Sequence, residues 1–113
     1  MSRNPPSRVE LLQGTLDLLI LTVLRRQPEH GYGIAAQIEA ISDDVLRVEE
    51  GSLYPALHRM EQAGWIGAEW HMTTNNRRAR LYRITRAGQK RLDEEHEKWD
   101  RLTKAVGKVL RFA

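Results

Sequence analysis

The sequence has no cysteine among its 113 residues. Disulfide bonds, thiolate metal sites and cysteine nucleophiles are therefore excluded, and a reducing cytoplasm is the simplest location. The first ten residues, MSRNPPSRVE, lack the apolar segment of a signal peptide. The most apolar stretch, residues 11–24, is interrupted by Gln13, Asp17 and Thr22 and is shorter than the roughly 20 residues of a membrane span. We expect a cytoplasmic protein with no membrane partner.

Patterns that hold metals or cofactors are also lacking. The segment GYGIAA over residues 31–36 fits the dinucleotide pattern G-x-G-x-x-A, but it does not directly follow a strand and no second βαβ unit comes after it. There is no phosphate-binding loop, nucleophile elbow or isolated acid pair. The histidines show no metal-ligand spacing: His30, His58, His71 and His96. We expect no metal, no cofactor and no enzymatic activity.

One part of the sequence is strongly basic. Residues 71–91 contain no Asp or Glu and seven cations, Arg77, Arg78, Arg80, Arg83, Arg86, Lys90 and Arg91. The whole chain has a formal net charge of only +3. Such a block in a nearly neutral chain suggests a polyanionic partner, although a solvated surface gives the same pattern.

Hydrophobic residues make up 41% of the chain, enough for one modest core. Residues 1–9 are expected to form a flexible arm. Residues 10–27 predict a helix that is apolar nearly all round and ends before Pro28, so part of its surface is expected to meet a second subunit. A second helix is expected over 31–41, with Ile34, Ile38 and Ile41 on one face.

The next segments predict a turn, a helix and a hairpin. Residues 42–44 form the turn, and 45–48 a brief strand. A third helix is expected from residue 51 to a left-handed cap at Gly64, with Leu53, Leu57 and Met60 facing inward. Strands over 65–72 and 80–85 follow, joined by a TTNN turn whose asparagines tolerate positive φ. Thr85 is expected to cap a last helix over 86–111.

This order predicts a mainly α fold with a small β-hairpin. Three helices followed by a two-stranded wing is the winged helix-turn-helix arrangement, here over residues 10–85, and residues 86–113 add a long C-terminal dimerisation helix. In a helix-turn-helix, the second helix of the pair enters the major groove of DNA. Proline is tolerated in the first turn of a helix, where N–H groups have no intrahelical partner.

The candidate DNA-binding residues lie on the third helix and on the wing. The third helix offers hydroxyl, ring and cationic groups from Ser52, Tyr54, Pro55, His58 and Arg59, and Tyr54, His58 and Arg59 are expected to include those that read bases. Arg77, Arg78 and Arg80 are expected at the wing tip, along the phosphate backbone or in the minor groove.

The last helix carries a pattern typical of a dimer seam. Leu92, Trp99 and Val106 recur every seven residues, and Leu102 and Val109 are their companions. The seam is imperfect because Glu95 occupies one of its positions, so Leu11 and Leu18 of the first helix are expected to complete the interface. Trp99 and its two-fold mate would form a pocket for a small aromatic effector, unless Trp99 is simply the largest interface side chain.

Four segments together resemble one protein family: QGTLDLLIL, HGYGIAAQI, EEGSLYPALHRMEQAGWI and NNRRARLYRITRAG. They are similar to the PadR family of bacterial transcriptional regulators, over about residues 12–92. The resemblance implies a winged helix-turn-helix domain that dimerises through its C-terminal helix and usually represses transcription. It places the family's tyrosines on Tyr32 and Tyr54 and its wing cations on Arg77, Arg78 and Arg80. The single C-terminal helix resembles the short subfamily.

The residues and the resemblance together predict a homodimeric, sequence-specific DNA-binding repressor that acts on a palindromic operator in double-stranded DNA. The alternative is a winged-helix module that binds proteins without reading DNA. That alternative predicts an apolar or acidic outer face on the third helix and a neutral wing.

Overall fold

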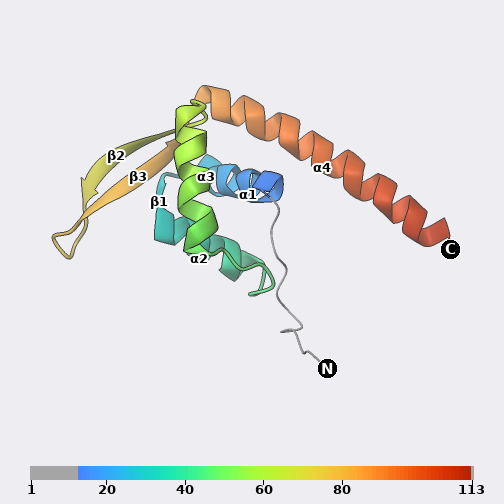
Figure 1. Cartoon of the computed structure of the whole chain (residues 1–113), viewed down its shortest axis with the longest axis horizontal. Helices are drawn as coiled ribbons and strands as arrows, with labels where there is room; N and C mark the ends of the chain where they lie inside the picture. The colour runs from blue at the N-terminus through green and yellow to red at the C-terminus, as the bar shows by residue number, and fades with distance from the viewer. Residues whose placement is uncertain (1–12, 113) are drawn as a thin grey trace.

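The computed structural model describes residues 13–112, so the expected arm over 1–9, the expected helix start at residue 10 and Leu11 lie outside the described residues. The elements, shown in Figure 1, are α1 (Gln13–Arg26), β1 (Glu29–His30), α2 (Gly31–Ile41), α3 (Glu50–Gln62), β2 (Ile66–Met72), β3 (Arg78–Ile84) and α4 (Arg86–Phe112). They form the winged helix-turn-helix order that the sequence predicts. Within the described range, no helix is long and apolar enough to cross a membrane.

Helix α1 lies at the centre of the fold. It contacts α2, α3, α4 and β3, and its buried residues are Leu16, Asp17, Leu18, Ile20, Leu21, Val23 and Leu24. The neighbours within the same chain therefore account for the helix being apolar nearly all round. Little of its described surface is left for a second subunit, contrary to expectation. Leu18, at 9% exposure, belongs to this core.

Helix α2 has the predicted bounds, but only part of the predicted face is buried. Ile34 and Ile38 lie in the core, whereas Ile41 is 65% exposed because the helix ends there. The chain then turns through Asp43 and Asp44, both at positive φ.

The strand expected over residues 45–48 is wrong, since only an isolated bridge forms at Leu46. Side chains satisfy this backbone in place of a strand partner. The Leu46 N–H donates to Oγ of Ser42 at 3.1 Å, and the Val48 N–H donates to Oε2 of Glu39 at 3.0 Å. Both acceptors lie at the end of α2, so they hold the loop close to that helix.

Helix α3 faces the core as the sequence predicts. Leu53, Leu57 and Met60 are at most 2% exposed, and Gly64 takes the left-handed conformation after the helix, with φ of 82°. The helix begins at Glu50, so Pro55 lies beyond the first turn, contrary to expectation. Its ring nitrogen cannot donate to the carbonyl of Gly51, and the α3 backbone gives up one hydrogen bond there.

The sheet contains a strand that the sequence analysis missed. Its order is β1-β3-β2, and both pairings are antiparallel. Strand β1 is only two residues long, too short to produce a recognisable alternation, and it pairs Glu29 and His30 with Tyr82 and Leu81. The hairpin turn agrees with expectation, since Asn76 has a φ of 60°.

Helix α4 starts on the domain and then leaves it. The N–H of Gly88 donates to Oγ1 of Thr85 at 3.0 Å, which is the predicted cap. Leu92, at 3% exposure, packs into the core, whereas the C-terminal half of α4 projects away from the other elements (Figure 1). At Gly88 the helix passes so close to the hairpin that a side-chain methyl group would overlap the carbonyl oxygen of Trp65.

Replacing Gly88 by alanine should therefore destabilise the fold. Overpacking against a fixed backbone carbonyl is expected to lower the free energy of unfolding by about 1–3 kcal/mol. Gly107→Ala is the matched control on the same helix, because its nearest neighbour is the flexible end of Arg111. That change should raise stability by up to about 1 kcal/mol through helix propensity. Urea denaturation at matched protein concentration measures both values, and stabilisation by both would contradict the close approach.

Candidate nucleic-acid interface

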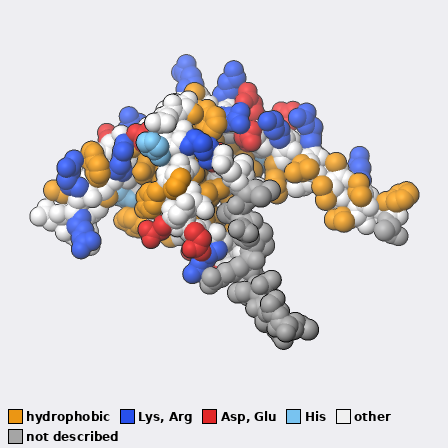
Figure 2. All heavy atoms as spheres, in the orientation of Figure 1, with side chains coloured by type: hydrophobic (Ala, Val, Ile, Leu, Met, Phe, Trp, Pro, Cys, Tyr) orange, Lys and Arg blue, Asp and Glu red, His pale blue; other side chains and the backbone are white. Residues whose placement is uncertain are grey.

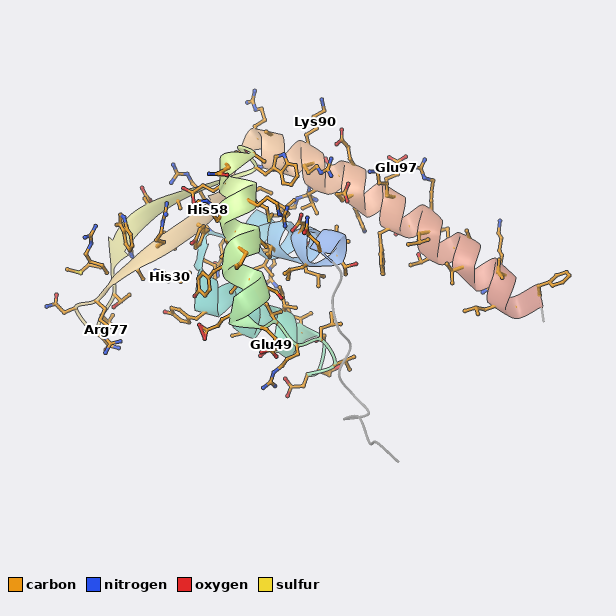
Figure 3. All side chains as sticks on the ribbon, viewed as in Figure 1. His30, Glu49, His58, Arg77, Lys90 and Glu97 are labelled. Atoms are coloured by element: carbon orange, nitrogen blue, oxygen red, sulfur yellow. The ribbon has the colours of Figure 1, made fainter. Side chains whose placement is uncertain are left out.

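The side of α3 that faces away from the core is exposed and polar. Tyr54 and His58 lie one helical turn apart on this side, and Ser52 and Pro55 are exposed near the start of the helix. Figure 3 shows His58 on the side of α3 that faces the viewer, with the wing extending beside it. Hydroxyl and imidazole groups at this spacing can donate to or accept from base edges and phosphates.

Arg59 does not lie free on this outward side, which corrects the expectation for it. Its Nη1 and Nη2 atoms donate to Oδ2 and Oδ1 of Asp17 at 2.8 and 2.9 Å. Asp17 is buried within α1, and these hydrogen bonds raise the pKa of Arg59 above its ordinary value. A two-pronged pair of this kind fixes the orientation of both side chains. Arg59 thus joins the candidate recognition helix to the central helix.

Two tyrosines meet at the start of α2. The Tyr54 ring lies against Gly31, where an added Cβ would be only 2.8 Å from Cε1 of the ring. Tyr32, the next residue, is 66% exposed and stacks on His30 with ring centroids 5.6 Å apart. The structure thus places Tyr32, which the resemblance singled out, close to α3.

The wing arginines occupy three different positions. Arg77 is exposed at the hairpin tip (Figure 3), and the Arg78 guanidinium lies 4.6 Å from the ring centroid of Trp70. Arg80 is not at the tip as expected. Its Nη2 atom pairs with Oε2 of Glu61 on α3 at 2.8 Å. Figure 2 shows Lys and Arg side chains along the wing, interspersed with hydrophobic ones.

Sequence reasoning missed Trp70. The alternation of the hairpin placed it on the same face as Ile66, and register confirms that placement. However, Ile66 is 2% exposed and Trp70 is 58% exposed, because this part of the hairpin extends past the helices. The signal available in the sequence was the short distance from Trp70 to the basic turn.

The outer part of α4 carries an exposed apolar stripe. Four residues expected in the dimer seam belong to it, with exposures of 41–71%: Trp99, Leu102, Val106 and Val109. Leu110 and Phe112 are even more exposed. Leu92, by contrast, is buried in the core of its own chain, and its expected place in the seam is wrong.

A groove of about 240 Å³ lies between α1 and α4. It is lined by Gly14, Thr15, Leu18, Glu95, Lys98, Trp99 and Leu102. The Glu95 carboxylate is held by Arg91 at 3.3 Å and by Lys98 at 3.4 Å, which explains how a carboxylate is accommodated beside apolar residues. Across residues 13–112, no three His, Cys, Asp or Glu side chains gather in a way that could hold a metal ion.

Comparison with known proteins agrees with this arrangement. The sequence pattern of the transcriptional regulator PadR-like family matches residues 20–94. The chain is 38% identical over 60 residues to the transcriptional regulator Rv3488 of Mycobacterium tuberculosis, which covers 53% of this chain and 55% of that protein.

Two solved structures resemble the whole fold. A transcriptional regulator from Clostridium thermocellum has a TM-score of 0.79 and 31% identity, over 85% of this chain and 93% of that one. A PadR family transcriptional regulator from Eggerthella lenta has a TM-score of 0.73 and 33% identity, over 87% and 83% of the two chains. With an exposed polar side of α3 and arginines on the wing, the chain belongs to the PadR-like family of transcriptional regulators.

Proposed function

We propose that the protein is a homodimeric, sequence-specific repressor that binds a palindromic operator in the cytoplasm. The observation that carries this proposal is the exposed polar side of α3, with Tyr54 and His58, next to a wing that bears three arginines. Helix α3 enters the major groove, and its polar side chains reach base edges and phosphates. The wing follows the backbone, where Arg77 and Arg78 supply affinity that does not depend on sequence.

Arg59 acts in this proposal through position. Its guanidinium is occupied by Asp17, so it holds α3 at a fixed angle to α1, and base reading falls to Tyr54 and His58. The alternative, a module that binds proteins alone, predicts a neutral wing and an apolar or acidic outer side of α3. The exposed arginines and the polar side chains of α3 are the opposite of both features.

The dimer is proposed to form through the exposed stripe of α4. Apolar side chains repeated along one side of a helix are stabilised by burial against an equivalent helix. A two-fold dimer presents two α3 helices to half-sites about one helical turn of DNA apart. Selecting bound fragments from a random duplex pool tests the whole proposal, because it must return inverted repeats of that spacing.

The wing and α3 should affect DNA binding in different ways. Arg77→Ala and Arg78→Ala should weaken binding to all duplexes alike and lower the salt slope by about 1 per phosphate contact, or about 2 per dimer. His58→Ala should instead cost about 1–3 kcal/mol per base contact and flatten sequence preference. Fluorescence anisotropy across a salt series measures both effects. Arg101→Ala removes an equal charge from α4 as a control, and unchanged slopes in both wing variants would rule out the assignment.

Light scattering at micromolar concentration should give twice the 13.1 kDa chain mass. The double change Leu102→Glu and Val106→Glu places charges on the stripe, and the cost of burying them should yield a monomer with weakened operator binding. Lys104→Glu, on the same helix but off the stripe, should remain a dimer. A wild-type monomer, or a dimer that survives the double change, would show that α4 is not the interface.

We also propose that a planar aromatic effector binds in the groove beside Trp99. Leu18 and Leu102 line this groove with Trp99, and a two-fold mate would add a second indole. Facing aromatic rings suit a flat apolar guest. A guest shifts the angle between the two α4 helices, and so operator affinity, only if it binds one angle more tightly.

Planar aromatic compounds should quench tryptophan fluorescence and release the operator from the wild type. Trp99→Leu should still dimerise and bind the operator, but these compounds should no longer release it. If the same compound releases the operator from Trp99→Leu as readily, Trp99 serves only in packing.

A further inference from the structure

The sheet face that carries Trp70 changes in character along the wing. On this face, Ile66, Ala68, Trp70 and Met72 of β2 lie directly opposite Ile84, Tyr82, Arg80 and Arg78 of β3. The first pairs are buried against the helices, whereas Trp70 and Met72 are each 58% exposed. Trp70 therefore contributes little to the core, and its apolar surface is available to a partner.

Two arginines hold the Trp70 ring in place. The guanidinium carbons of Arg78 and Arg80 lie 4.6 and 5.5 Å from its centroid, within cation–π range. Arg80 is itself fixed, because it pairs with Glu61 and also lies 5.9 Å from the Tyr82 ring. An aromatic side chain that is already ordered loses little conformational entropy on binding.

The Glu61–Arg80 pair also shows which way this face is directed. Tyr54, His58 and Glu61 are spaced i, i+4 and i+7 along α3, so they share one side of that helix. Glu61 connects that side to Arg80 at 2.8 Å. The Trp70 face of the wing and the outward side of α3 therefore form one continuous surface, and Figure 2 shows the wing and this side of α3 in a single view.

From this geometry we propose that Trp70 is an additional DNA-binding residue, which enters the minor groove next to the major groove occupied by α3. There the indole packs against deoxyribose and base edges, Met72 extends the apolar contact, and Arg78 reaches a phosphate. This inference rests on the proposed function. Apolar side chains flanked by cations suit the minor groove, where sugars form the walls and phosphates line the rims.

Charge favours DNA as the partner of this surface. Strands β2 and β3 with their turn carry Arg77, Arg78, Arg80 and Arg83 against the single acid Glu69. Glu69 pairs with Arg83 at 3.5 Å, and both belong to the opposite face of the hairpin by register. Among residues 13–112, no carboxylate lies within 4.0 Å of the Arg77 or Arg78 guanidinium. The Trp70 face therefore offers cations to a polyanion.

A single-tryptophan protein tests the contact directly. Trp65→Phe and Trp99→Phe leave Trp70 as the only tryptophan among the three in the chain. Adding a mixed-sequence A·T-rich duplex should quench its fluorescence and protect it from acrylamide. The minor-groove ligand netropsin should reverse both changes, whereas the major-groove ligand methyl green should not. A duplex that binds without changing Trp70 fluorescence would overturn the proposal.

Affinity provides the second test, on the otherwise wild-type chain. Trp70→Ala should weaken binding by about tenfold, as expected for loss of one aromatic contact to nucleic acid, with an unchanged salt slope because no charge is removed. Trp70→Phe should retain most of the affinity. Ile41→Ala, which removes another exposed apolar side chain at the end of α2, should have no effect. Circular dichroism verifies that each variant is folded.

The results separate the two proposals. If the wild type shows no saturable DNA binding, the proposed function fails and this inference fails with it. If the wild type binds and Trp70→Ala binds equally well, only the inference fails. If Trp70→Ala weakens binding but also lowers the salt slope, and the single-tryptophan protein shows no quenching, Trp70 only orders the arginines and the minor-groove contact is overturned.

Discussion

The orientation of α3 depends on the ion pair between Asp17 and Arg59. Burying a carboxylate is costly unless charge and hydrogen bonds compensate, and Arg59 supplies both through two hydrogen bonds at 2.8 and 2.9 Å. Apolar contacts by Leu53, Leu57 and Met60 hold α3 on the core, but they are non-directional and allow the helix to rotate or slide. The planar guanidinium fork permits only a narrow range of angles, so it sets which side of α3 is presented to DNA.

Much of the fold follows from local signals in the sequence. The spacing of Leu53, Leu57 and Met60 gave the correct inward side of α3, and Gly64, Asn76 and Thr85 marked a helix end, a turn and a helix start correctly. Each signal depends on the backbone near one residue. The sequence analysis failed where distant residues decide the outcome: β1 forms only because Tyr82 and Leu81 arrive beside it, and Leu46 loses its expected strand because Ser42 and Glu39 take the backbone hydrogen bonds.

The candidate site shows the same division. Periodicity placed Tyr54 and His58 on the outward side of α3, where the structure has them exposed. Periodicity cannot show that a cation on a helix surface has an acid 42 residues away in the chain, as Arg59 does in Asp17. Nor does it separate Leu92 from Trp99, seven residues apart on the same stripe, because burial depends on where α4 leaves the domain. Trp70 was missed for a related reason: alternation gives the face of a strand but not how far that face is covered.

Helix α1 brings together the two regions on which regulation of such a protein would depend. Asp17 contacts Arg59 of α3, and the adjacent residue Leu18 lines the groove that contains Trp99. These side chains project from neighbouring positions of one rigid helix, so a displacement of α1 at the groove also moves the carboxylate that orients α3. Coupling between two sites requires an element with two arrangements that each site can favour. The angle between α1 and α4 is the element that meets this requirement here, because the outer half of α4 projects from the domain while its first turns are fixed by Leu92 and Gly88.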